Sequence, residues 1–126
     1  MKRGLIALLI TTTVALGCST GTKTYKVRGT VSWKGTPIEK GQIHLYAEDN
    51  TTPPASAPII HGNFEMEAPP GRKRVEIYSQ KQGEFDKTMG ASKIYNDIPP
   101  EYNSNSKLRF EVQPNNDNVL NLQLPQ

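Results

Sequence analysis

The stretch YKVRGTVSW, residues 25–33, decides the fold class of this chain. Its side chains alternate, with Tyr25, Val27, Val31 and Trp33 on one face and charged or hydroxyl side chains on the other. A period of two residues is typical of a half-buried β-strand, because successive side chains of a strand point to opposite faces of the sheet. We therefore predict that a strand with one buried face opens the folded domain.

The same alternation recurs along the rest of the chain. It is found in QIHLYAE (42–48), RKRVEIYSQ (72–80), LRFEV (108–112) and LNLQL (120–124). Residues 58–68 also resume the pattern, with Ile59-Ile60, a predicted hairpin turn at Gly62-Asn63, and then FEME (64–67). Clusters of Gly, Pro, Asn and Asp separate these stretches, and no helical periodicity follows Cys18. About seven short strands joined by such turns predict an all-β fold, a single antiparallel immunoglobulin-like or prealbumin-like β-sandwich.

Two segments lack the alternation, and we predict that both are mainly loops. Residues 49–58 (DNTTPPASAP) contain three prolines, which cannot donate to a sheet ladder. Residues 81–100 are polar, and Ile94, Tyr95 and Ile98 are the side chains expected to pack there.

The start of the chain has the pattern of an export signal. Lys2 and Arg3 precede fourteen uncharged residues, and Cys18 follows them directly. A basic start and a short apolar run are typical of a secretory signal peptide, and fourteen residues are fewer than the ~20 that span a bilayer. We predict a signal peptide over 1–17, a lipidated polar tether over 18–24 and a β-sandwich domain over 25–126.

The segment ALGC, residues 15–18, resembles the lipobox of bacterial lipoprotein precursors. The resemblance implies that Cys18 carries lipid, that cleavage occurs before it, and that the protein is exported and anchored to the outer membrane or the periplasmic face of a membrane. Two or three acyl chains give stable anchoring. Cleavage would leave thirteen basic and twelve acidic residues, a net charge of +1 in place of +3. We therefore expect no nucleic-acid partner.

The segment from residue 25 to residue 80 resembles the carboxypeptidase-regulatory-like, transthyretin-like sandwich domains. The matching positions are Val27, Gly29, Val31, Gly35, Pro37, Gly41, Ile43, Gly62, Phe64, Met66, Pro70, Gly71, Val75 and Ile77. Together with the lipobox, the pattern is similar to that of small planctomycete-like lipoproteins. The resemblance implies a fold and leaves the function open, because such folds host many roles.

Residues with catalytic or metal-binding potential are sparse. His44 and His61 are the only histidines, and their spacing matches no metal motif. A single cysteine excludes an intrachain disulfide, and no nucleophile elbow of the form G-x-S-x-G occurs. We expect a protein without catalytic activity, cofactor or bound metal.

The remaining function classes are binding and structure. The leading interpretation is a structural or protein-binding module that is held at the membrane by lipid and contacts envelope proteins or surface polysaccharides. The alternative is a carbohydrate-binding module at the cell surface, in which Tyr46, Tyr78, Tyr95 and Tyr102 stack on sugar rings. Trp33 falls on the core-facing side of its strand, which argues against a role in binding.

Overall fold

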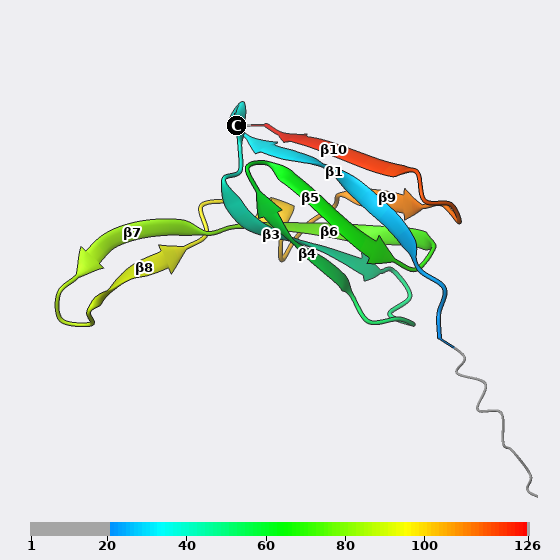
Figure 1. Cartoon of the computed structure of the whole chain (residues 1–126), viewed down its shortest axis with the longest axis horizontal. Coiled ribbons are helices and arrows are strands. Elements are labelled where there is room, and N and C mark those ends of the chain that lie inside the picture. The colour runs from blue at the N-terminus through cyan, green and yellow to red at the C-terminus, as the bar shows by residue number, and fades with distance from the viewer. Residues whose placement is uncertain (1–20, 126) are drawn as a thin grey trace, which may run out of the picture.

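The computed structural model of the chain describes residues 21–125, which are almost entirely β-structure (Figure 1). The predicted signal peptide and Cys18 lie outside the described residues. The elements are β1 (Tyr25–Trp33), β2 (Thr36–Pro37), β3 (Lys40–Ala47), β4 (Ala55–Ile60), β5 (Asn63–Ala68), β6 (Gly71–Ser79), β7 (Lys81–Asp86), β8 (Ala91–Tyr95), the 3₁₀ turn η1 (Pro100–Tyr102), β9 (Arg109–Val112) and β10 (Asn118–Leu124).

The main sheet has the strand order β10-β1-β5-β4-β3-β6-β9, and β2 pairs with β1 beside this path. Its neighbours are antiparallel with one exception. The last strand, β10, runs parallel to β1, with Val27 opposite Asn118 and Trp33 opposite Leu124. The sequence predicts a purely antiparallel sandwich, and the parallel pairing of β10 with β1 differs from that prediction. The pair is parallel because residues 113–117 carry the chain from β9 at one edge of the sheet to β10 at the other edge.

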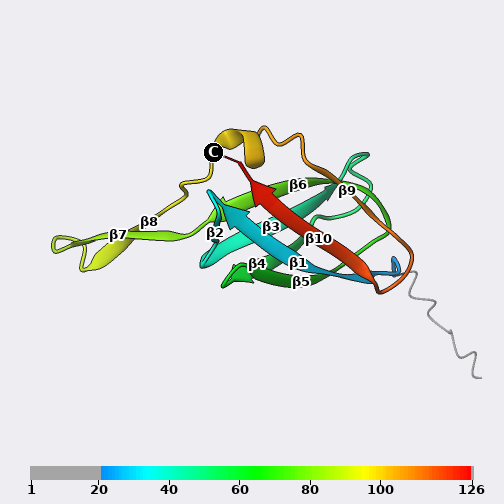
Figure 2. The same ribbon diagram turned by 90° about the horizontal axis from the view of Figure 1, so that it is seen from above.

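The sheet folds over on itself to make two layers (Figure 2). The division lies between β4 and β5, which pair only at Ile60 and Asn63, on either side of a tight turn. His61 and Gly62 both have positive φ there, as a two-residue hairpin turn of type I′ requires. The predicted hairpin is present, but its turn lies one residue before the predicted Gly62-Asn63. One layer contains β10, β1 and β5, and the other contains β4, β3, β6 and β9.

The inward-facing side chains of the two layers form one hydrophobic core. This agrees with the predicted all-β sandwich, because each alternating strand buries its apolar face against the opposite layer. The core comprises Val27, Val31, Ile38, Ile43, Leu45, Ala57, Ile59, Phe64, Met66, Ala68, Val75, Ile77, Ile98, Val112, Leu120 and Leu124.

The prediction of a loop over 49–58 is wrong at its C-terminal end, where β4 begins at Ala55. Pro58 lies within β4, opposite Gln42 of β3. Because β4 pairs with β5 only at Ile60, the side of β4 away from β3 is open at Pro58. A proline is tolerated at such an edge position, since no neighbouring strand requires its missing N–H.

The prediction of a loop over 81–100 is also wrong in its larger part. Strands β7 and β8 form a two-stranded hairpin, residues 81–95, which projects from the sandwich and which we call the arm (Figure 1). Ile98 is buried, as predicted. Ile94 and Tyr95 are exposed, because the arm extends into solvent and has no layer to pack against.

Candidate functional site

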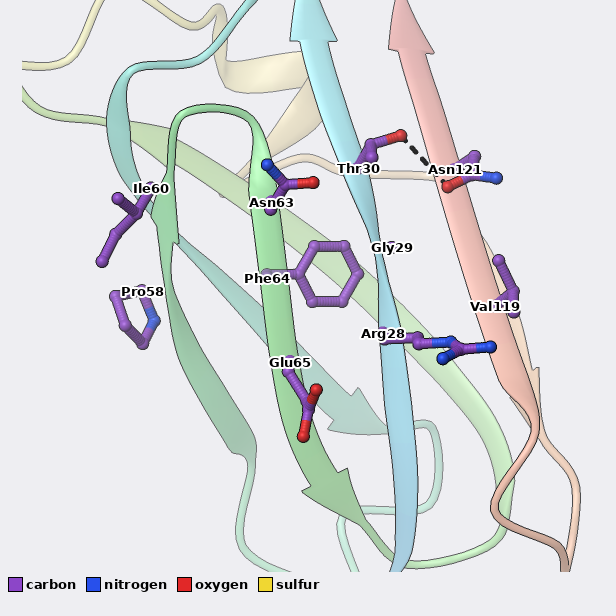
Figure 3. A pocket seen from close by; sticks show the side chains of 10 residues that line it. All are labelled: Arg28, Gly29, Thr30, Pro58, Ile60, Asn63, Phe64, Glu65, Val119 and Asn121. Carbon is purple, nitrogen blue, oxygen red and sulfur yellow. Dashed lines mark hydrogen bonds between the residues drawn. The ribbon is translucent and has the colours of Figure 1, made fainter.

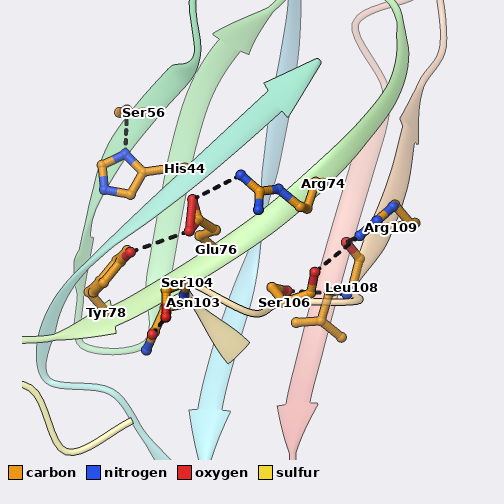
Figure 4. A network of polar contacts seen from close by, with 10 residues as sticks. All are labelled: His44, Ser56, Arg74, Glu76, Tyr78, Asn103, Ser104, Ser106, Leu108 and Arg109. Carbon is orange, nitrogen blue, oxygen red and sulfur yellow. Dashed lines mark hydrogen bonds and ion pairs between the residues drawn. The ribbon is translucent and has the colours of Figure 1, made fainter. Parts of the chain in front are cut away.

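A polar and aromatic cluster lies on the outer face of β3 and β6 (Figure 4). Alternation along each strand directs these side chains away from the core. The strand register places His44 opposite Glu76, Tyr46 opposite Arg74, and Gln42 opposite Tyr78. We call this surface the outer cluster.

Glu76 is the centre of the outer cluster. It is only 4% exposed although it points away from the core, because its neighbours on β3 and β6 cover it. The Tyr78 hydroxyl donates to Glu76 Oε1 at 3.3 Å, and Arg74 Nη2 lies 3.6 Å from Glu76 Oε2 (Figure 4). Alternation along β6 predicts that Glu76 faces solvent. Its burial depends on the side chains of β3 and β6 around it, which the sequence pattern does not reveal.

The two tyrosines of the outer cluster are held as neutral phenols. Burial raises the pKa of Tyr46 and of Tyr78, and the negative charge of Glu76 raises both further. The Arg74 guanidinium lies 5.0 Å from the centre of the Tyr46 ring, and His44 meets the Tyr78 ring edge-on at 5.6 Å. Both rings are therefore fixed by neighbours and partly covered.

His44 also contacts Ser56 of β4, with 2.6 Å between His44 Nδ1 and Ser56 Oγ. A serine nucleophile requires a histidine that a third group orients. Within residues 21–125, no hydrogen bond joins His44 to a carboxylate, and no group of three side chains has the composition of a metal site. The pair connects β3 to β4 across the sheet.

Three of the four tyrosines predicted as ligand contacts border one surface. A hollow of about 370 Å³ between the outer cluster and the arm is lined by residues including His44, Tyr78 and Tyr95. A second hollow of about 430 Å³ is lined by residues that include Tyr46 and Arg74. Tyr102 lies elsewhere, because its ring packs against Trp33 with 5.9 Å between the centroids.

The arm carries most of the exposed large apolar side chains of the described chain. They are Phe85 (62% exposed), Met89 (71%), Ile94 (72%) and Tyr95 (53%), and the other two are Ile60 and Val119. Phe85 pairs with Ser92 and Gln82 pairs with Ile94, which places Phe85 and Ile94 on the same face of the hairpin. The sequence gives no signal for this surface, because the arm lacks alternation.

Ile60 and Val119 border a third surface, a shallow groove of about 590 Å³ across β4, β5, β1 and β10 (Figure 3). Thr30 Oγ1 donates to Asn121 Oδ1 at 3.0 Å beside it and ties β1 to β10. The groove has charged residues at one end, Arg28 and Glu65.

Comparison with known proteins places the chain in no family. No protein-family model and no curated protein matches the sequence. Among solved structures, the chain is similar to a 9R-lipoxygenase from Cyanothece PCC8801, with 14% identity and a TM-score of 0.41. The match covers 82% of this chain and 16% of the lipoxygenase. Residues 21–125 contain no helix that is long and apolar enough to cross a membrane.

Proposed function

We propose that this protein is a lipid-anchored, extracytoplasmic β-sandwich that binds a partner protein through the arm, without catalysis. The observation that carries the proposal is the position of the arm. It projects at the end of the sandwich remote from the start of β1 (Figure 1), and it exposes Phe85, Met89, Ile94 and Tyr95. A chain anchored at Cys18 would therefore present the arm away from the membrane.

The physical argument for a partner is that the arm leaves apolar surface uncovered. A two-stranded hairpin on its own is marginally stable in water, and it gains stability when another surface packs against it. Exposed apolar patches mark interaction sites, and aromatic residues and Met are enriched where proteins bind one another. Phe85 and Ile94, on one face of the hairpin, supply such a patch.

The anchor is tested by changing its single thiol. We expect the Cys18→Ser variant to leave the membrane fraction, and we expect the mass of the mature wild-type chain to exceed its peptide mass by that of the lipid. A Cys18→Ser variant that stays in the membrane fraction, together with an unmodified wild-type mass, would overturn the anchor.

The arm is tested by photo-crosslinking in cells, with a photoreactive amino acid placed at Ile94 and, as a matched control, at Val119. Both positions are exposed on strands, and Val119 lies on β10, outside the arm. We expect one defined crosslinked partner from position 94 and none from position 119. Phe85→Ser should abolish that crosslink. Equal crosslinking from both positions would contradict the proposal.

A carbohydrate-binding function is the second candidate, favoured by the gathering of Tyr46, Tyr78 and Tyr95 around two neighbouring hollows. This candidate predicts that the protein binds specific sugars on a glycan array. Tyr78→Ala would abolish binding, whereas Tyr78→Phe would retain it, because the phenyl ring still stacks on sugar. An array with no Tyr78-dependent signal would exclude this candidate.

A further inference from the structure

A hollow of about 410 Å³ lies at the end of the sandwich opposite the arm. It is lined by the last residue of β3 and by residues 48, 49, 51 and 52 after it, by residues 69–73 at and just before the start of β6, and by Thr22. The arm follows the other end of β6, about 30 Å away along a nine-residue strand. Thr22 is four residues from Cys18, a span of at most ~14 Å. The hollow is thus at the end that the proposed anchor would hold against the membrane.

Lys73 is the unusual residue of this hollow. It faces inward on β6, opposite Ala47 and Phe110, and is only 3% exposed. Among the residues that the structure describes, its ammonium group makes no ion pair and no hydrogen bond. Thr52 Oγ1 is the one buried side-chain nitrogen or oxygen atom without a hydrogen-bond partner in residues 21–125, so the unpaired Lys73 ammonium nitrogen keeps accessible surface and can be reached from the hollow. The stem of Lys73 is buried and its charged head has no protein partner, an uncommon state for a lysine at this exposure.

The carboxylates beside Lys73 have other partners. Glu48 accepts a hydrogen bond from Arg109 Nε at 2.5 Å and lies 3.5 Å from Arg72 Nε. Asp49 Oδ1 accepts from both the backbone N–H and the hydroxyl of Thr51, at 3.1 and 2.7 Å. Burial lowers the pKa of Lys73, and the negative charge of Asp49 partly offsets this lowering. The two arginines therefore share Glu48, and Lys73 has no ion-pair partner within residues 21–125.

Thr52 supplies a second group without a partner in the same hollow. Its hydroxyl oxygen is buried, and it has no hydrogen-bond partner in residues 21–125. An ammonium group can only donate, and a hydroxyl can donate one hydrogen bond. A ligand that brings acceptor oxygens would satisfy both groups at once.

We propose that this hollow binds a phosphate group, and that its source is the headgroup of a membrane phospholipid beside the anchor. Lys73 and Thr52 donate to two phosphate oxygens, and the exposed Arg72 at the rim reaches a third. The headgroup source rests on the proposed function, because anchoring at Cys18 brings the bilayer to this end. The phosphate chemistry rests only on the described residues.

The first experiment uses the predicted mature chain, residues 18–126, with Cys18→Ser, and inorganic phosphate, with chloride at matched ionic strength as the reference salt. We expect phosphate to raise the melting temperature of this chain more than that of Lys73→Met, because the general stabilising effect of phosphate is the same for both chains. In Lys73→Met the affinity for phosphate should fall at least about tenfold, because a charge-assisted hydrogen bond is lost. Lys26→Met is the matched control, since Lys26 is exposed and pairs with Glu65 at 3.2 Å.

A second variant separates binding from folding. Thr52→Val keeps the shape of the side chain and removes the hydroxyl without a partner. We expect it to fold normally and to weaken phosphate binding. An unchanged phosphate response in both Lys73→Met and Thr52→Val would overturn the site.

The source of the phosphate is tested with vesicles. We expect the Cys18→Ser chain to bind vesicles of phosphatidylglycerol and not vesicles of an uncharged glycolipid, and we expect Lys73→Met to lose this binding. Lys73-dependent binding of inorganic phosphate without vesicle binding would overturn the lipid source. Because this chain carries no lipid anchor, the result does not depend on whether Cys18 is lipidated.

Discussion

At the scale of single residues, a buried amide holds β10 in place. Asn118 Nδ2 donates to the carbonyl groups of Lys26, Gln113 and Asn115 at 3.2, 3.1 and 2.7 Å. Its Oδ1 accepts from the Gln113 N–H at 2.7 Å. We expect Asn118→Asp to lower the free energy of unfolding by about 2–4 kcal/mol, because a buried carboxylate would face three carbonyl oxygens. Urea denaturation measures the change.

Asn121 on the same strand provides the matched control. Its Oδ1 accepts from the Thr30 hydroxyl at 3.0 Å in an exposed position. A carboxylate can accept the same hydrogen bond, so Asn121→Asp should change the free energy of unfolding by less than about 0.5 kcal/mol. Equal losses in the two variants would show that the three carbonyl contacts of Asn118 do not decide its role.

Gly29 is required by the close approach of β10 to β1. A Cβ at this position would collide with the carbonyl group of Leu120. We expect Gly29→Ala to lower the free energy of unfolding by about 3 kcal/mol or more, because the parallel strands must separate. Gly21→Ala serves as the control, since nothing lies within 4 Å of a Cβ there. Thermal unfolding that is equally affected in both would argue against this contact.

Because of the tyrosines of the outer cluster, we expect the free energy of unfolding to fall as the pH rises above about 10. The pKa of Tyr46 and Tyr78 is raised in the folded state, so the unfolded chain loses these protons first. Their contribution is complete below the unfolded pKa of about 10 and is lost as the pH rises through the folded values. We expect the double variant Tyr46→Phe and Tyr78→Phe to lose less stability above about pH 10 than the wild type. Coincident profiles of unfolding free energy against pH would contradict this.

At the scale of elements, the arm is an addition to the sandwich. It forms its own two-stranded sheet, and none of its residues belongs to the hydrophobic core. Gln82 and Ile94 are paired, so an Asn-Gly turn can replace residues 83–93 between them. We expect the shortened chain to keep its free energy of unfolding within about 1 kcal/mol, because no core contact is lost. A large loss in urea denaturation would mean that the arm supports the sandwich.

The elements that the sequence predicts well are those with one buried face. Strands β1, β3, β6 and β10 alternate because one layer packs against the other, and this pattern can be read along the chain. The start of strand β4, residues 55–58, was assigned to a loop because the tolerance of Pro58 depends on where β5 diverges from β4, which the sequence does not reveal. The arm was missed because neither of its faces is buried in this chain.

The candidate sites also combine features that alternation along a strand predicts with features that depend on tertiary packing. In RKRVEIYSQ (72–80), alternation puts Lys73 on the same face as Val75 and Ile77, and Tyr78 on the other face, as observed. Alternation in QIHLYAE likewise puts Tyr46 on the outer face, as observed. Alternation does not predict the burial of Glu76, which depends on the side chains around it. The hollow around Lys73 forms only where two loops and the entering chain meet, so no local pattern reveals it.

At the scale of the whole molecule, β6 connects two sites of opposite character. Its first three residues, which include Lys73, line the hollow, and its last residue, Ser79, lies two positions before the start of the arm. If the lipid anchor and the phosphate site both hold one end to the bilayer, the arm should stand about 30 Å farther out, the length of a nine-residue strand. That arrangement would let the arm reach a partner without contact with lipid.

This orientation is open to chemical labelling. With the Cys18 thiol blocked by lipid, a cysteine placed at Met89 in the arm or at Thr51 beside the hollow would be the only free thiol. Both positions are exposed in the structure. On vesicles, we expect the cysteine of Met89→Cys to react with a membrane-impermeant thiol reagent as fast as in the lipid-free Cys18→Ser chain. The cysteine of Thr51→Cys should react several-fold more slowly on vesicles, because the bilayer covers this end. Slower reaction at both positions would mean that the arm lies along the membrane.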